Sequence, residues 1–291
     1  MINTLIINYP WFMYLVIGLF SLAVGSLLNV IIYRLPIILQ EEWREQCCEL
    51  FNLEQRKEKI KLNLFLPRSF CPHCKAMVKA WQNIPLLSYI LLRGRCYQCN
   101  SPISIRYPFI ELLTTALSLY ASWHFGFTVQ LLFVLLAIWI LIPLTFIDLD
   151  HQLLPDSLTL GLLWLGLIAN TWSIFVSLDI AVLSCAGAYL ALWVFINLFY
   201  LITGKVGMGH GDFKLFAAFG AWFGWMYLPL ILLMSSITGA IIGLIYLRIN
   251  DKSSDTAISF GPFLCISGLI AMFWGKAIIN WYIKFWFNNL I

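Results

Sequence analysis

Four cysteines form the clearest chemical pattern in the sequence. Two Cys-x-x-Cys pairs, Cys71 with Cys74 and Cys96 with Cys99, are separated by 21 residues. This spacing is typical of a tetrahedral zinc site, because each pair turns both thiolates toward one point. Four thiolates leave no open coordination position, so the predicted Zn²⁺ is structural and not catalytic. His73 lies inside the first pair, and we expect it not to be a ligand while four cysteines are present.

Two aspartates form a second candidate site. Asp148 directly follows the uncharged run 131–147, and Asp212 follows the glycine-rich segment 207–211. Ionisable groups at the edge of a hydrocarbon layer are costly and by default read as functional. Two carboxylates in a poorly solvated site share one proton, so one acts as base toward water while the other polarises a carbonyl. The pattern favours cleavage of a peptide bond and leaves open which aspartate is the base.

The segment before Asp212 also has a structural alternative. Asp212 opens an apolar helix and could simply cap its first turn. Glycines at 207, 209 and 211 allow positive φ and the close approach of another backbone, as a substrate strand beside a catalytic acid requires. We therefore predict that Gly209 and Gly211 bind substrate. The segment lacks the strand of a dinucleotide fingerprint and the Lys-Ser/Thr of a phosphate loop, which excludes both nucleotide sites.

Other acids near these sites have structural explanations. Asp156 follows Pro155 and precedes an apolar run, which predicts a helix N-cap. Asp150 can reach solvent from the opposite side of its helix. Glu111 is expected to pair with Arg106 or with an arginine at another helix end. Asp148 and Asp212 remain the acids that are hardest to explain as ordinary solvent-exposed surface residues.

The elements that must position these residues are helices in a membrane. Apolar residues make up 61% of the 291 residues and charged residues only 11%, and the mean hydropathy is +0.85. Soluble domains carry about a quarter charged residues, so the chain is predicted to be an all-α polytopic membrane protein. About eight transmembrane helices are expected, at residues 9–32, 109–124, 129–147, 157–176, 180–202, twice within 215–247, and 257–286. A turn at 224–229 separates the two helices of the uncharged stretch, of which the first is short.

The charge distribution predicts the orientation of these helices. Of 18 lysines and arginines, 12 lie between Arg34 and Arg106, and basic loops stay cytoplasmic. The division predicted is a first transmembrane helix (1–33), a cytoplasmic domain with the tetracysteine zinc site (34–107) and a transmembrane core (108–291). Both aspartates then fall at the cytoplasmic edge. Interspersed glutamates argue against a nucleic-acid surface, and residues 37–62 are predicted to form a charged amphipathic helix and linker.

The reducing cytoplasm also decides among the roles of the cysteines. It disfavours a pair of disulfides between the Cys-x-x-Cys pairs, and a redox site would need only one such pair. Cys47 and Cys48 are adjacent and lack ligand spacing. Cys185 and Cys265 lie in apolar runs and are expected to be small core residues. Zinc remains the favoured interpretation of the four loop cysteines.

The sequence as a whole resembles the type IV prepilin leader peptidase and N-methyltransferase family of Gram-negative bacteria. The resemblance covers essentially the whole chain. It rests on five stretches in order: Gly-Ser-Leu-Leu-Asn-Val-Ile-Ile-Tyr-Arg-Leu-Pro (25–36), the two cysteine pairs, Arg-Tyr-Pro-Phe-Ile-Glu (106–111), Ile-Asp-Leu-Asp-His-Gln-Leu-Leu-Pro-Asp (147–156) and Gly-Met-Gly-His-Gly-Asp-Phe-Lys (207–214). His210 departs from the tyrosine that is more common at its position in the family motif.

The resemblance implies a bifunctional inner-membrane enzyme. It would cleave the leader of type 4 prepilins and of type II secretion pseudopilins after a glycine, at the cytoplasmic face. It would then methylate the new N-terminal residue with S-adenosylmethionine. By motif position the catalytic residues would be Asp148 and Asp212. The methyltransferase rests on the resemblance alone, since no Rossmann-like unit is visible, and the oligomeric state is open.

Two other classes of function are weighed against this one. A proton-coupled transporter would use the same aspartates as relay groups, although transport sites usually lie near the midplane of the membrane. A zinc module that only scaffolds assembly would need the cysteines and not the aspartates. The acids at one membrane edge favour the peptidase.

Overall fold

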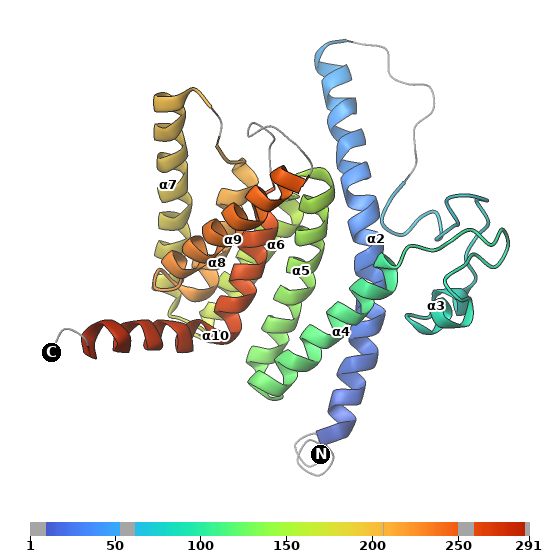
Figure 1. Cartoon of the computed structure of the whole chain (residues 1–291), viewed down its shortest axis with the longest axis horizontal. Helices are drawn as coiled ribbons and strands as arrows, with labels where there is room; N and C mark the ends of the chain where they lie inside the picture. Colours follow the sequence, from blue (N-terminus) through green and yellow to red (C-terminus); the bar gives the residue numbers. More distant parts are fainter. Residues whose placement is uncertain (1–9, 53–61, 206, 250–258, 289–291) are drawn as a thin grey trace. The chain divides into compact units, whose positions relative to one another are not determined.

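The computed structural model describes residues 10–52, 62–205, 207–249 and 259–288 (Figure 1). The chain divides into two compact units, residues 1–127 and 128–291. Unit 1 contains α2 (Pro10–Leu50), the 3₁₀ helix η1 (Ala80–Asn83), α3 (Leu87–Leu91) and α4 (Arg106–Phe125). Unit 2 contains α5 (Val129–His151), α6 (Asp156–Thr171), α7 (Leu178–Thr203), α8 (His210–Phe223), α9 (Leu228–Ile249) and α10 (Gly261–Asn288). The described residues hold no strand beyond two isolated β-bridges.

The first helix is longer than predicted. The sequence predicted a first transmembrane helix to residue 33 and a charged amphipathic helix and linker at 37–62, and in the structure α2 continues through Pro36 to Leu50. Proline removes one backbone hydrogen bond, and helix-forming residues on both sides maintain the helix across it. Residues 37–50 are therefore helical, as predicted, and continue the first helix without a break, while residues 53–61 lie outside the described residues.

Within unit 1, α2 packs closely against α4. Gly25 permits this approach, because a Cβ at that position would lie 2.8 Å from the Cα of Glu111. Four residues later, Asn29 Nδ2 donates to the carbonyl of Tyr107 over 3.1 Å. The buried Arg34 extends the contact by donating to the carbonyl of Pro67 over 2.7 Å. The end of the first span is thus tied to the loop that carries the cysteines.

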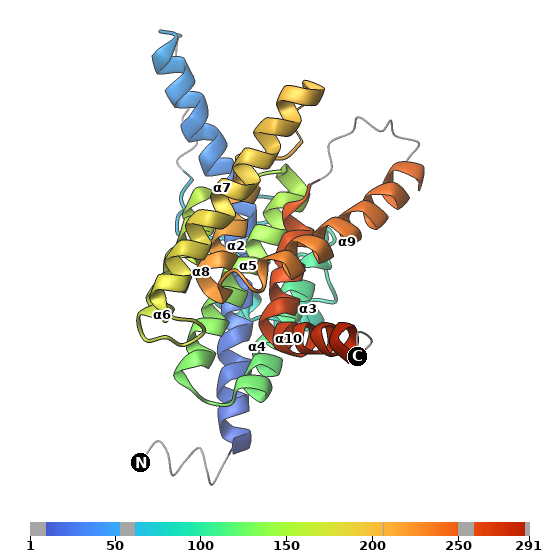
Figure 2. The same ribbon diagram turned by 90° about the vertical axis from the view of Figure 1, so that its left-hand side faces the viewer.

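Within unit 2, the short helix α8 is surrounded by α6, α7, α9 and α10 (Figure 2). All its residues from Asp212 to Phe223 are buried except Lys214. Trp222 Nε1 donates to the carbonyl of Leu162 in α6 over 2.8 Å, and Asn170 Nδ2 donates to the carbonyl of Ala221 over 2.8 Å. Lipid could not supply hydrogen-bond partners to these polar side chains, whereas the neighbouring helices do. Helix α8 is thus enclosed by protein.

All eight long helices expected from the sequence are present. The predicted turn at 224–229 separates α8 from α9, and the predicted short sixth helix is the 14-residue α8. By length and composition, five of the described helices are able to cross a membrane, namely α2, α5, α7, α9 and α10. The chain is therefore a multi-pass membrane protein with an all-α fold.

Candidate active site and zinc site

Asp148 lies in the last turn of α5, and its carboxylate is held by the start of α10. Ser259 Oγ donates to Asp148 Oδ2, and the backbone N–H of Gly261 donates to the same carboxylate. Only glycine fits at 261, since an added Cβ would overlap that carboxylate. Asp148 is only 5% exposed. Helix α5 ends just beyond it, where Gln152 adopts a left-handed conformation. Neither Ser259 nor Gly261 was singled out from the sequence, because no local pattern links them to residue 148.

Asp212 is the third residue of α8, and its surroundings are different. Its carboxylate accepts the backbone N–H of the N-cap residue Gly209. Its other oxygen, Oδ1, is buried without a hydrogen-bond partner among the described residues. The capping role accounts for one oxygen and leaves the second unexplained. Such an orphaned buried acceptor is costly unless it is protonated or meets a ligand.

The structure brings the two aspartates into one electrostatic environment. Burial first, and then the charge of Asp148, raise the pKa of Asp212 to about 7. Asp212 lies ahead of the apolar run of α8 and outside the five candidate spans. Beside the two aspartates, Leu154 packs between Gly211 and Gly261. A Cβ on Gly211 would lie 2.8 Å from Leu154 Cβ, and one on Gly261 would lie 3.1 Å from Leu154 Cδ2.

The glycines before Asp212 do not use the positive φ that the sequence suggested. Gly209 has φ −79° and ψ 154°, and Gly207 and Gly211 also lie outside the left-handed region. Gly211 instead makes room for Leu154. At Gly209 an added Cβ would meet only Asp212 Oδ2, at 3.6 Å. The space beside Gly209 is therefore open toward the carboxylate, whereas the space beside Gly211 is filled.

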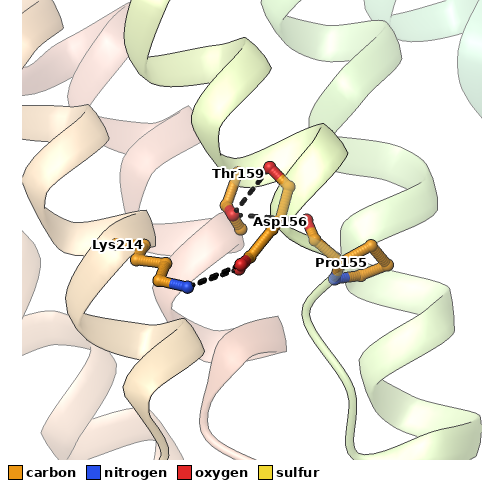
Figure 3. Close-up of polar contacts among 4 residues, drawn as sticks. All are labelled: Pro155, Asp156, Thr159 and Lys214. Carbon is orange, nitrogen blue, oxygen red and sulfur yellow. Dashed lines mark hydrogen bonds and ion pairs between the residues drawn. The ribbon is translucent and has the colours of Figure 1, made fainter. Parts of the chain in front are cut away.

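Asp156 is not the N-cap that the sequence predicted. The N-cap of α6 is Pro155, and Thr159 Oγ1 donates back to its carbonyl over 3.2 Å. Asp156 is the first helical residue, and its carboxylate binds Lys214 Nζ of α8 at 2.6 and 2.7 Å (Figure 3). The ion pair connects the first turns of α6 and α8. Lys214 was missed as a positioning candidate, although it lies two residues after Asp212.

The four loop cysteines converge as predicted. Their sulfur atoms all lie within 4.8 Å of one another, and Cys71 Sγ is 3.8 Å from Cys99 Sγ. Four thiolates at this separation suit a tetrahedral Zn²⁺. His73 does not belong to this cluster among the described residues.

The two cysteine pairs lie in matching turns. In each turn the first cysteine N–H donates to the carbonyl five residues on, at 2.9 Å for Cys71 and 2.8 Å for Cys96. Lys75 and Asn100, each directly after the second cysteine, both adopt positive φ. Backbone N–H groups in the first turn, Cys74 first, lower the pKa of the Cys71 thiol to about 6. The thiolate that a metal requires is therefore already favoured there.

A cavity of about 480 Å³ lies beside the zinc site, within unit 1. Its walls include Tyr33, Phe70, Tyr107 and Glu111. Among the described residues, no arginine pairs with the Glu111 carboxylate. Its Oε2 accepts the N–H of Leu86 over 2.8 Å, in a largely buried position. The predicted arginine pair is thus replaced by a backbone contact that fixes one wall of the cavity.

The remaining cysteines lie apart from the zinc cluster. Cys265 is fully buried in α10, as expected for a core residue, whereas Cys185 in α7 is half-buried. Cys47 and Cys48 lie near the end of α2. None of these four is near enough to the zinc cluster to join it.

Comparisons with known proteins show the family of the chain. The Bacterial Peptidase A24 N-terminal domain matches residues 19–125, and the Type IV leader peptidase family matches residues 135–244. A prepilin leader peptidase/N-methyltransferase of Legionella pneumophila is 87% identical over 98% of this chain and 100% of its own length. Those of Stutzerimonas stutzeri and Pseudomonas aeruginosa are 51% and 50% identical, over 91% and 92% of this chain and 92% of their own lengths.

No solved structure matches the chain. The sequence relatives nevertheless extend over nearly all of it and include both the cysteine loop and the aspartate helices. The chain belongs to the prepilin leader peptidase/N-methyltransferase family.

Proposed function

We propose that this protein cleaves the leader of type 4 prepilins and type II secretion pseudopilins after a glycine, and then methylates the new N-terminal residue. The relatives are named for both activities. The observation that supports the peptidase activity is that two acids are buried and interact electrostatically. One oxygen of Asp212 also has no hydrogen-bond partner among the described residues. Asp148 and Asp212 are the proposed catalytic residues.

The mechanism follows from two carboxylates that hold one proton. The ionised member takes a proton from water, and the protonated member donates to the scissile carbonyl oxygen. The roles reverse when the tetrahedral intermediate collapses and the leaving amine is protonated. Burial keeps bulk water away from the pair, so these interactions act in a low dielectric.

Gly209 is the glycine best suited to bind the substrate backbone. The open space next to its Cα faces Asp212 Oδ2, so a peptide can approach the carboxylate there. Gly211 contributes differently, because its missing side chain admits Leu154. We therefore assign Gly209 to substrate contact, and Gly211 to seating the start of α8.

The cavity in unit 1 is the proposed site of methyl transfer. Its volume falls in the range of about 300–1,000 Å³ that is typical of small-molecule sites. S-adenosylmethionine supplies the methyl group and carries an aromatic base and a cationic sulfonium. Tyr33 and Tyr107 offer aromatic faces for the base and the sulfonium, and Glu111 offers a carboxyl group that can accept hydrogen bonds. These residue types fit both parts of the ligand.

The zinc site has a structural role in this proposal. Cys71, Cys74, Cys96 and Cys99 would hold Zn²⁺ and join the two turns into one module. Cys71 and Cys96 also line the cavity. The metal would thus shape the methyl-transfer site without acting on substrate.

The proposed location of this unit is the cytoplasmic side of the bacterial inner membrane, and the basic residues between Arg34 and Arg106 support it, because basic loops stay cytoplasmic. The substrates proposed are themselves membrane-anchored, which brings their leader to the edge where Asp148 and Asp212 lie. A proton-coupled transporter remains the alternative with the same acids, and it would show proton flux without peptide cleavage.

Mass spectrometry of a prepilin N-terminus, with and without S-adenosylmethionine, tests the proposal. We expect the wild-type protein to remove the leader in both cases and to add one methyl group only with the donor. D148A and D212A should each abolish cleavage, whereas D150A, which changes the exposed neighbour of Asp148, should retain it. Near wild-type cleavage by either single variant would refute the two-aspartate mechanism.

A cavity-filling variant separates the two activities. Val30 lines the cavity from α2, so V30W should obstruct it. We expect V30W to cleave the prepilin and to leave its N-terminus unmethylated. Full methylation by V30W would exclude this cavity as the methyl-transfer site.

A further inference from the structure

The hydrogen-bond donors around the two aspartates are arranged differently. Asp148 Oδ2 accepts the Ser259 hydroxyl, and the same carboxylate accepts the backbone N–H of Gly261. The Asp212 carboxylate accepts the backbone N–H of Gly209 and its own backbone N–H, while its Oδ1 is buried and unpartnered among the described residues. Both residues are more than nine-tenths buried, so bulk solvent does not supply the hydrogen bond that Asp212 Oδ1 lacks.

Such an asymmetry decides where a shared proton resides. Donors that point at a carboxylate stabilise its ionised form. A buried carboxylate oxygen without a donor is penalised when charged, but a protonated carboxyl carries its own O–H group. The proton is therefore more stable on Asp212 than on Asp148.

We propose that Ser259 is a positioning residue that holds Asp148 as the ionised base, so that Asp212 carries the proton toward the scissile carbonyl. This inference rests on the proposed peptidase function and adds the assignment of roles within the pair. Ser259 acts through Asp148 and does not itself touch the substrate in this mechanism.

The assignment gives a balanced reaction with water as the second reactant. Asp148 takes a proton from water, the hydroxide forms a bond to the carbonyl carbon, and the Asp212 proton passes to the carbonyl oxygen. The intermediate is a neutral gem-diol. Asp148 then gives its proton to the amide nitrogen as the C–N bond breaks, and one diol hydroxyl returns a proton to Asp212. The products are a carboxylic acid and an amine, and the pair is restored.

Few other titratable groups face Asp148. Helix α8 contributes Asp212, and α10 contributes the thiol of Cys265, which interacts with both aspartates. Helix α6 contributes only Asp156, which is occupied by Lys214. Asp150 and His151 follow on α5 itself and are exposed. Among the described residues, the groups that stabilise the ionised form of Asp148 are the Ser259 hydroxyl and the Gly261 N–H.

The pH dependence of kcat/KM for prepilin cleavage tests the proposal with S259A and S259T. Removing the hydroxyl destabilises every state in which Asp148 is ionised. If Asp212 carries the shared proton, Asp148 is ionised in both the singly protonated and the fully ionised pair. S259A should then move the acidic limb upward by about one to two pH units and leave the basic limb in place. S259T keeps the hydroxyl and should restore the wild-type profile.

Each other outcome has a distinct meaning. A basic limb that moves while the acidic limb stays would place the proton on Asp148 and overturn the assignment. A uniform fall in kcat/KM, with both limbs unmoved, would make Ser259 merely structural and would also overturn it. Failure of the wild-type protein to cleave any prepilin would instead refute the proposed function itself.

Discussion

Asp148 and Asp212 share an electrostatic environment but not a set of contacts. Asp148 is fixed by two donors from the start of α10, whereas Asp212 has one free, buried oxygen. Burial and the neighbouring charge place the pKa of Asp212 near neutral pH, at about 7. A group that changes charge at this pH is suited to proton transfer near neutral pH.

The raised pKa of Asp212 predicts a pH-dependent cost to stability. Below about pH 4 the carboxyl is neutral in both folded and unfolded chains, so no cost arises. As the pH rises from about 4 to 7, the unfolded chain releases the proton while the folded chain retains it, and the folded state is progressively penalised. We expect D212N, which cannot ionise, to unfold at a higher temperature than wild type at pH 8. The gain should be no more than about 4 kcal/mol and should shrink toward pH 4.

Thermal unfolding in detergent at pH 4, 6 and 8 measures this effect. D150N is the matched control, because Asp150 is exposed and should show no such pH-dependent gain. An increase in stability of D212N that is the same at all three pH values would contradict the expectation, since it would arise from packing and not from ionisation.

At the scale of helices, the start of α8 is positioned from two sides. Lys214 is paired with Asp156 of α6, and Gly211 seats Leu154 from the turn between α5 and α6. The ion pair is partly exposed, with side-chain exposures of 28% for Lys214 and 60% for Asp156. Its contribution to stability is therefore about 0–1 kcal/mol, and orientation of α8 is its more important effect.

We expect K214M and D156N each to lower kcat/KM for cleavage several-fold with little change in unfolding temperature. The charge-reversed double variant D156K/K214D should recover most of the loss, because it rebuilds the contact between the first turns of α6 and α8. Cleavage assays on the wild type, the two single variants and the charge-reversed double variant measure the recovery. A double variant that is no more active than either single variant would show that the pair does not position α8.

At the scale of the molecule, the chemistry is divided between two compact units. The cysteines and the cavity belong to residues 1–127, and the aspartates to residues 128–291. The residues of each site are held in place in a different way in the two units. Zinc ligation would hold the loop of unit 1, whereas enclosure by helices holds α8 in unit 2.

This division predicts selective effects of metal loss. C74S should release zinc, expose residues 62–105 to protease and abolish methylation, because Cys71 and Cys96 line the cavity. Leader cleavage should persist at a reduced level, since no cysteine ligand lies in unit 2. H73A should keep one zinc per chain, because His73 is outside the cluster. Metal analysis, limited proteolysis and mass spectrometry of the product check these points. Complete loss of cleavage in C74S, or full methylation of its cleaved product, would contradict them.

The sequence by itself determined the features that are local or periodic. Apolar runs of about membrane thickness predicted the eight long helices, and the two Cys-x-x-Cys pairs predicted the zinc cluster, because spacing fixes the geometry of a short turn. It also singled out Asp148 and Asp212, since an acid beside an uncharged run is costly wherever the chain folds.

Only the tertiary structure decided how distant segments meet. Ser259 lies 111 residues from Asp148, and Lys214 lies 58 residues from Asp156, so no local pattern could pair them. The same reason explains why Asp156 was wrongly predicted to be an N-cap, and why the contact of Glu111 with the backbone N–H of Leu86 was not foreseen. The different arrangement of donors around the two aspartates depends on the packing of α10 and α8 around α5 and α6, and that packing assigns the base and the acid.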